Sequence, residues 1–145
     1  SAEDLAAEEE AAARLCAALQ DAGYRIGCYT YSNIDYGKQG ASAIQEDLQK
    51  WNDKILPMLG EYGCNILVYA READIADKDA SYSGSKFNVM YNAGYRFFLG
   101  ANSESYSQIG DQYVRHDRLC ITGEYLAKYP ERFDGLFDPF TLTAY

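Results

Sequence analysis

The sequence is poor in the residue types and motifs that most often fix a chemistry. Its 145 residues include one histidine, one tryptophan, two methionines and three prolines. A single imidazole cannot supply the histidine pairs that many zinc sites use. The sequence also has no G-x-S-x-G motif and no glycine-rich phosphate loop. These absences argue against a nucleophile-elbow serine hydrolase and against a nucleotide-binding loop.

Long apolar runs and positive charge are scarce as well. No apolar run approaches the roughly 20 residues that cross a bilayer, so we expect no membrane insertion. No signal peptide is recognised, and the first residue is not methionine, as expected of a fragment that could have lost an export signal. Acidic side chains outnumber basic ones by 22 to 13, which gives a formal net charge of −9. That charge repels phosphate backbones and anionic membrane surfaces, so nucleic acid is not an expected partner.

Cysteine occurs without the spacing that typifies a metal site. The four cysteines are Cys16, Cys28, Cys64 and Cys120, and no C-x-x-C is present. A zinc site built on cysteine pairs is therefore not expected. We interpret the four as buried thiols, with one disulfide left open because sequence alone cannot pair them.

Apolar residues make up 48% of the chain, enough for the core of one domain of this length. Hydrophobic periodicity predicts alternating helices and strands. Three of the predicted helices are residues 4–20, residues 85–93 and a short one near 123–128. A fourth starts at Ser42, where Gln45 completes a capping box, and is closed by Pro57 and Gly60. The predicted strands are residues 24–30, 65–69 and 95–100. Residues 111–118 are expected to be an exposed polar segment, and the tail 133–145 to pack over the sheet.

Helices that alternate with apolar strands predict an α/β fold, with a parallel sheet and crossover helices. Sites in such sheets form at the carboxyl ends of the strands. The ends of the predicted strands are residues 29–35, 69–74 and 100–107. The identical tetrapeptides at 22–25 and 93–96 each mark a helix stop followed by a strand entry.

The first strand end carries a family resemblance. The stretch Tyr29-Thr30-Tyr31-Ser32-Asn33 resembles the His-[Ser/Thr]-aromatic-[Ser/Gly]-His loop of the polysaccharide deacetylase (NodB-type) family. In that family the two histidines help to bind a divalent metal such as zinc, which activates water. Here Tyr29 and Asn33 stand at the histidine positions, and neither is a good zinc ligand. The resemblance therefore implies a loop like that of the family but without its metal ligands, and we expect no cofactor.

Later segments continue the resemblance in matching order. They are residues 47–51, 69–74 (Tyr-Pro-Phe-Gly-Ala-Asp in one branch of the family), 93–98, 108–115 and 137–139. The resemblance implies that residues 1–145 are a single deacetylase-like domain fragment, the later part of a distorted (β/α) barrel whose N-terminal strands are absent. An open sheet edge is then expected, covered by self-association or by the missing half. Members of the family are commonly exported, which implies an extracellular or cell-envelope location.

Two functions remain open from the sequence. The first is a deacetylase-like domain that has lost catalysis and serves as a glycan-binding or structural part of a cell-envelope protein. The second is an active carbohydrate hydrolase, an N-deacetylase or glycosidase, with Glu72, Asp74 or His116 as catalytic candidates. The default interpretation of the charges at one strand end is an internal ion pair among Arg71, Glu72 and Asp74. The candidate substrate contacts are Tyr29, Tyr31, Asn33, Tyr69, Arg71 and Arg115, and Tyr106 is a further tyrosine near a strand end to be tested.

Overall fold

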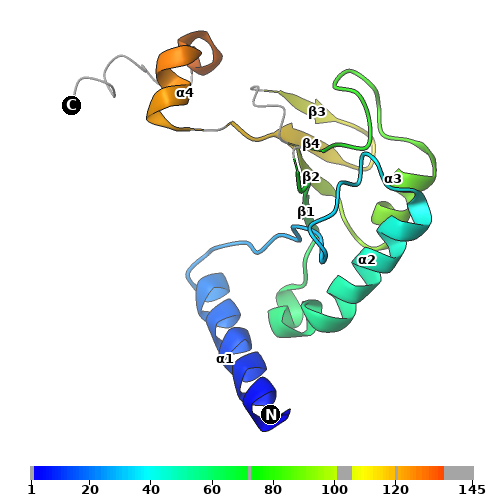
Figure 1. Cartoon of the computed structure of the whole chain (residues 1–145), viewed down its shortest axis with the longest axis vertical. Coiled ribbons are helices and arrows are strands. Elements are labelled where there is room, and N and C mark those ends of the chain that lie inside the picture. Colours follow the sequence, from blue (N-terminus) through cyan, green and yellow to red (C-terminus); the bar gives the residue numbers. More distant parts are fainter. Residues whose placement is uncertain (1, 72, 101–105, 120, 136–145) are drawn as a thin grey trace.

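The structure of the protein is a computed structural model, and it describes residues 2–71, 73–100, 106–119 and 121–135. Within these residues the chain has an α/β fold around one four-stranded sheet (Figure 1). The strands are β1 (Ile66–Val68), β2 (Phe97–Gly100), β3 (Ser107–Ile109) and β4 (Val114–Asp117), in the order β1-β2-β4-β3. Strands β1, β2 and β4 are parallel, and β3 runs antiparallel to β4.

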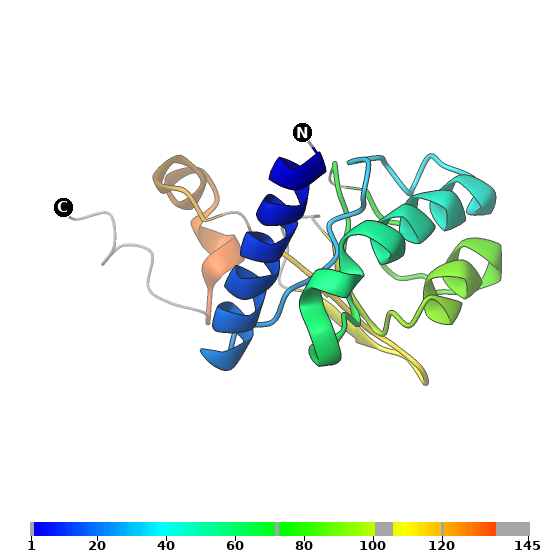
Figure 2. The same ribbon diagram turned by 90° about the horizontal axis from the view of Figure 1, so that it is seen from below.

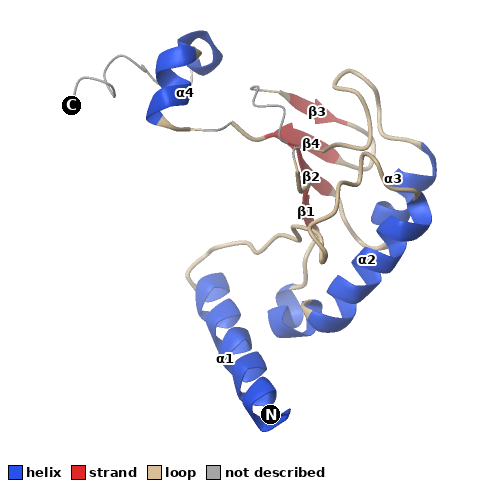
Figure 3. Ribbon diagram, in the orientation of Figure 1, coloured by secondary structure: helices blue, strands red, loops and turns tan. Residues whose placement is uncertain are grey.

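Two of the α-helices cover the sheet, and the other described α-helices lie away from that layer (Figure 1). The α-helices are α1 (Ala2–Asp21), α2 (Ala41–Lys54), α3 (Gly84–Asn92) and α4 (Gly123–Lys128), and the 3-10 helices are η1 (Leu56–Tyr62) and η2 (Pro130–Phe133). Helices α2 and α3 pack against each other and cover one face of the sheet (Figures 1 and 2). Figure 3 shows α1 and α4 set away from that layer, with α1 packed on η1. No helix in the described part has the length and apolarity that a membrane span requires.

The core lies between the sheet and the α2–α3 layer. Leu67, Phe98 and Arg115 occupy matching positions on β1, β2 and β4, and all three are buried. Because side chains alternate along a strand, these three share one face. The ring of Phe98 lies 6.0 Å from that of Phe87 on α3, with ring centroids as the reference points. An aromatic cluster therefore joins the sheet to the helix layer, as expected for a covered sheet face.

The opposite face of the sheet is open. One row across it consists of Ile66, Phe97, Val114 and Ile109, which pair in register from β1 to β3. Phe97 is 43% exposed and Ile109 is 83% exposed. The α1 side chains of Leu5, Leu15 and Leu19 are also exposed and do not belong to the core. The described strands form an open sheet, and closure into a barrel stays a prediction.

Several predicted elements are confirmed and others are wrong. The predicted helices at 4–20, 85–93 and 123–128 and the strands at 65–69 and 95–100 match elements of the structure to within about two residues at most ends. The capping box is wrong, because α2 begins after Gly40, which makes no side-chain cap hydrogen bond. The strand at 24–30 is reduced to one bridge, between Cys28 and Leu67. Residues 111–118 are not an exposed segment, since they contain β4 with Arg115 and Asp117 buried.

The predicted packing of the tail can be compared only at its start. Phe133 is buried, and its ring lies 6.2 Å from that of Tyr125 on α4, between centroids. The start of this segment therefore packs against α4, and packing of the tail over the sheet stays a prediction. Residues 136–145 lie outside the described residues.

Candidate functional site at the carboxyl edge of the sheet

The loop after the Cys28 bridge is folded around a buried aspartate. Asp47, on α2, accepts hydrogen bonds from the backbone N–H groups of Tyr31 and Ser32, both at 2.8 Å. The hydroxyl of Tyr36 donates a third bond to the same carboxylate at 2.8 Å. Asp47 is 3% exposed. A buried carboxylate with three donors is well satisfied, so it holds this loop in one conformation.

Two cations and a glycine hold the rest of the loop. The Lys86 ammonium on α3 donates to the carbonyl oxygens of Tyr36, at 3.1 Å, and Gly37, at 2.6 Å. The Nε atom of Arg71 donates to the Asn33 carbonyl at 2.7 Å. A Cβ atom added at Gly37 would lie 2.6 Å from the backbone oxygen of Asp74, so only glycine fits at this contact. These contacts bring the first and second strand ends together.

Backbone strain gathers at the same place. In the described part of the chain, three residues other than glycine have positive φ: Thr30 at 59°, Asn33 at 51° and Arg71 at 57°. This conformation is rare for a β-branched residue such as threonine. The Thr30 hydroxyl is also buried and has no hydrogen-bond partner among the described residues. Strained residues with unsatisfied polar atoms recur at ligand sites, where the surroundings hold them in place.

The loop presents two tyrosine rings to solvent. Tyr29 is 47% exposed and Tyr31 is 45% exposed. The Arg118 guanidinium carbon lies 5.9 Å from the centroid of the Tyr29 ring. Arg118 also donates to the carbonyls of Gly100, at 2.7 Å, and Tyr69, at 2.9 Å, which joins the ends of β2 and β1. The carboxyl edge therefore combines exposed aromatic rings with a fixed cation.

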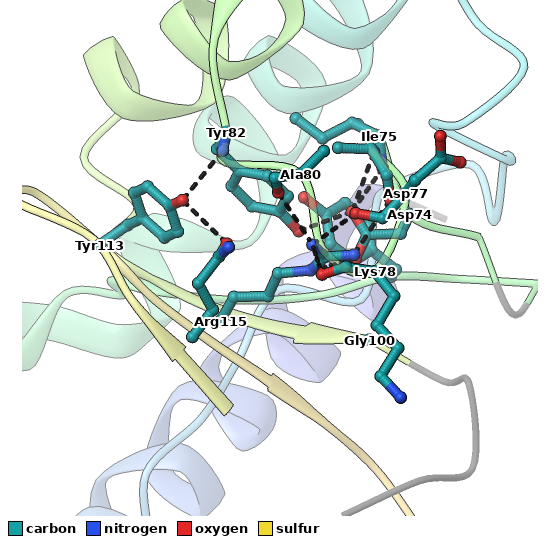
Figure 4. A network of polar contacts seen from close by, with 12 residues as sticks. Asp74, Ile75, Asp77, Lys78, Ala80, Tyr82, Gly100, Tyr113 and Arg115 are labelled. Atoms are coloured by element: carbon teal, nitrogen blue, oxygen red, sulfur yellow. Dashed lines mark hydrogen bonds and ion pairs between the residues drawn. The ribbon is translucent and has the colours of Figure 1, made fainter. Parts of the chain in front are cut away.

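Behind this edge lies a buried ion pair, shown in Figure 4. The Nε atom of Arg115 is 2.9 Å from Oδ2 of Asp74, and these side chains are 0% and 8% exposed. The Tyr82 hydroxyl and two backbone N–H groups donate to Oδ1 of Asp74. The remaining Arg115 nitrogens donate to the carbonyls of Ala76, Asp77, Lys78 and Ala80. The loop that follows the second strand end is thus wrapped around one guanidinium group.

The burial of this pair shifts the pKa of its carboxyl group. Desolvation raises the pKa of Asp74 above the usual aspartate value, although the Tyr82 hydroxyl, the Arg115 cation and two backbone N–H groups oppose the shift. Burial also raises the pKa of the Tyr82 phenol, because a phenolate beside Asp74 would be poorly solvated. Tyr82 therefore remains a neutral donor to Asp74. The network is a support for the loop, and its polar groups are occupied within the chain.

The structure brings four of the predicted contact residues together. Three of them lie on the loop after the Cys28 bridge, namely Tyr29, Tyr31 and Asn33. The fourth, Arg71, lies at the strand end that is hydrogen-bonded to this loop. Two others must be corrected. Tyr69 is buried and stacks on Phe98 with 6.3 Å between centroids, and Arg115 is fully buried in the ion pair, so neither side chain can meet a ligand directly.

The predicted catalytic candidates do not converge. Asp74 pairs with Arg115 rather than with Arg71, so the expected local ion pair is wrong for these two residues. His116 is exposed as predicted, and its Nδ1 lies 2.5 Å from Oγ of Ser107. Because Arg115 and His116 are neighbours on β4, their side chains point to opposite faces of the sheet. Glu72 lies outside the described residues, and Tyr106 is half-buried with its ring centroid 5.6 Å from the Arg115 guanidinium carbon.

Sequence reasoning missed three residues that build the site: Asp47, Lys86 and Arg118. Only Asp47 left a usable signal, because it falls on the apolar stripe of its helix, three residues after Ile44 and four before Trp51. An acid on a buried stripe needs a partner, and that need could have pointed to the loop. The two cations make their contacts to backbone carbonyls, for which the sequence has no marker.

Metal-ligating side chains do not gather in the described part of the chain, where no group of three or more His, Cys, Asp or Glu could hold an ion. Three cavities lined by described residues lie elsewhere, between α2 and α3, at the start of β1 and beside the β3–β4 turn. Comparison with known proteins finds no matching family model, no similar curated protein and no similar solved structure. The chemistry of the carboxyl edge is therefore the basis on which a function can be inferred.

Proposed function

We propose that this protein is a polysaccharide-deacetylase-like domain that binds a glycan through its carboxyl edge and does not deacetylate it. The exposed rings of Tyr29 and Tyr31, on a loop fixed by the buried Asp47, carry this proposal. Aromatic faces pack well against the apolar faces of sugar rings. A loop already held in its binding conformation loses little entropy when a ligand arrives.

The same surroundings favour binding over catalysis. Asp74 is bonded on both oxygens by Arg115, Tyr82 and backbone N–H groups, which leaves it poorly placed to exchange a proton with a substrate. His116 lies on the other face of the sheet from Arg115 and its partner Asp74. The sequence resemblance supplies the remaining support, because Tyr29 and Asn33 replace the family's histidines. It also supports placement in a cell-envelope or extracellular protein.

Titration with N-acetylated and de-N-acetylated oligosaccharides, followed by ¹H–¹⁵N NMR, tests the proposal. We expect shifts confined to the 29–37 loop and residues near Arg71. Tyr29→Ala and Tyr31→Ala should each weaken binding about 3- to 10-fold, as the loss of one aromatic contact implies. Tyr24→Ala is the matched control, since Tyr24 is exposed but lies before the bridge residue Cys28.

Two results would overturn the proposal. One is the absence of binding to any oligosaccharide tested. The other is release of acetate from the N-acetylated substrates on addition of zinc, cobalt or nickel, which would make the protein an active deacetylase. The same assay with an Asp74→Asn variant would then show whether Asp74 acts in that reaction.

We also propose that the open face of the sheet is where a second copy of the chain packs. The register row Ile66, Phe97, Val114 and Ile109 contains no charge, although the chain carries a net charge of −9. Two copies can meet on this row without opposing like charges. Sedimentation velocity should show a dimer that Ile109→Lys dissociates, whereas Ile121→Lys, at another exposed isoleucine, should leave it intact. A monomer at every concentration would refute this contact.

A further inference from the structure

We propose that the glycan bound at the carboxyl edge is acidic, and that Arg71 binds its carboxylate while Tyr29 and Tyr31 pack on its rings. This inference rests on the proposed glycan-binding function and adds the class of sugar. It follows from two arginines at this edge, Arg71 and Arg118, that lack a carboxylate partner among the described residues.

Arg71 is exposed and already oriented. Its Nε atom is used by the 2.7 Å hydrogen bond to the Asn33 carbonyl. In the described part of the chain no further bond engages its two terminal nitrogens. A guanidinium group held through Nε presents those nitrogens as a fork, which matches the two oxygens of a carboxylate.

Arg118 adds a second positive charge near the same strand end. Its Nη2 atom donates to the carbonyl of Tyr69, only two residues before Arg71, and its guanidinium carbon lies 5.9 Å from the centroid of the Tyr29 ring. Two described acids near these arginines are buried. Asp74 is paired with Arg115, and Asp117 lies against Gly100. Neither of these two carboxylates is available to pair with Arg71 or Arg118.

The sign of this charge is unusual for the molecule. Acids outnumber bases by 22 to 13, so most of the protein's field repels an anion. An acidic sugar would be held where the exposed Arg71 and the half-buried Arg118 lie near one strand end, each without a carboxylate partner among the described residues. The tyrosine rings of the loop contact a sugar ring on its face, and a carboxylate at C6 projects from the edge of that ring toward the flanking arginine. A hexuronate fits both features at once.

The test uses tetramers of galacturonate, glucuronate and mannuronate, each with its carboxyl-reduced counterpart. Each pair differs only at C6, so calorimetric titration at low salt measures the contribution of the carboxylate. We expect at least one acidic tetramer to bind tenfold or more tightly than its reduced counterpart, with an affinity that falls as salt rises. Sulfated tetramers of neutral sugars form a third arm, and tighter binding there than to every hexuronate would overturn the assignment to a carboxylate.

Variants separate the roles of charge and stacking. Arg71→Gln should bring the acidic and reduced tetramers to within about two- to threefold of each other, while any loss of loop support through the missing bond to Asn33 weakens both members of a pair alike. Tyr29→Ala should weaken both members of a pair equally. Arg14→Gln, on an exposed arginine of α1 that pairs with Glu10, is the control and should change neither. Thermal melts confirm that each variant is folded.

The outcomes distinguish this inference from the function on which it rests. Equal binding of acidic and reduced tetramers, or a preference that survives Arg71→Gln, refutes the acidic-sugar inference and leaves glycan binding standing. Failure of every tetramer and every neutral oligosaccharide to bind refutes glycan binding itself.

Discussion

Replacing Arg115 with methionine removes the cation around which the loop after β1 is built. Arg115 is fully buried, pairs with Asp74 at 2.9 Å, and donates to four backbone carbonyls between Ala76 and Ala80. Methionine fills similar space with an unbranched apolar chain, so the change removes charge and donors with little loss of volume. We expect the variant to be strongly destabilised.

The magnitude follows from what is left behind. Removing one partner of a buried ion pair costs about 3–5 kcal/mol, because the other charge stays buried without compensation. Carbonyls that lose their donor cost about 1–3 kcal/mol each if they stay buried, but a surface loop can turn them toward water. We therefore expect a loss of about 4 kcal/mol from a total that is typically about 5–15 kcal/mol. For a domain of this size that loss lowers the melting temperature by about 10–15 °C.

Urea unfolding followed by circular dichroism and by Trp51 fluorescence measures the loss, since Trp51 is buried and is the only tryptophan. Arg14→Met, at an exposed surface pair, should change the free energy of unfolding by less than about 0.5 kcal/mol. Adding Asp74→Asn to Arg115→Met should recover at least about 1 kcal/mol, because the stranded charge is removed. A loss below about 1 kcal/mol in the single variant, or further destabilisation in the double variant, would refute the reasoning.

Three further predictions concern the loop and its surroundings. Gly37→Ala should cost about 1–3 kcal/mol in thermal melts, because its Cβ would meet a backbone oxygen at 2.6 Å, whereas Gly40→Ala, with nothing within 4 Å, should be near neutral. Asp47→Asn should speed hydrogen exchange at the backbone amides of Tyr31 and Ser32, which donate hydrogen bonds to this carboxylate. Unchanged exchange would count against the role of Asp47 in holding the loop. Burial raises the pKa of the Cys28 thiol from 9.0 to about 12. The unfolded thiol ionises first, so stability should fall between about pH 9 and pH 12, and Cys28→Ala should flatten that fall.

The sequence predicted most helices and two strands because periodicity and glycine stops are local signals. It could not show that residues 24–30 would form only one bridge. Their apolar pattern suits a strand, but the segment lies at the outer edge of β1 and, among the described strands, pairs with β1 alone. The positive φ of Thr30 then turns the chain away from the sheet. Neither the edge position nor the turn has a marker in the apolar pattern.

Strand β4 shows a second limit. Its sequence, Val-Arg-His-Asp, resembles an exposed polar segment, yet Arg115 and Asp117 are buried. Arginine is buried here only because Asp74, 41 residues earlier in the chain, supplies the opposite charge. A partner at that separation cannot be inferred from one sequence. The same fact explains why the expected local pair between Arg71 and Asp74 did not form.

The carboxyl-edge rule, in contrast, held for the contact between two strand ends, while the ligand site expected there stays a prediction. It predicted that the loop at Tyr29–Asn33 and the strand end at Arg71 would lie together, and the Arg71–Asn33 bond confirms their contact. What the rule could not supply was the anchor, Asp47, whose bonds to the loop depend on the way α2 packs on the sheet.

The charged side chains at this edge fall into two groups, those that hold the backbone and those that face solvent, and this division bears on function. Buried and half-buried charges hold the backbone: Asp47 and Lys86 fix the loop, and the Asp74–Arg115 pair fixes the segment behind it. Strained non-glycine residues cost about 1–3 kcal/mol each, so the three at this edge require such anchors. A surface loop with no task could relax to an unstrained conformation at lower cost. Its fixed presentation of exposed tyrosines near Arg71 is the arrangement that the proposed glycan site requires.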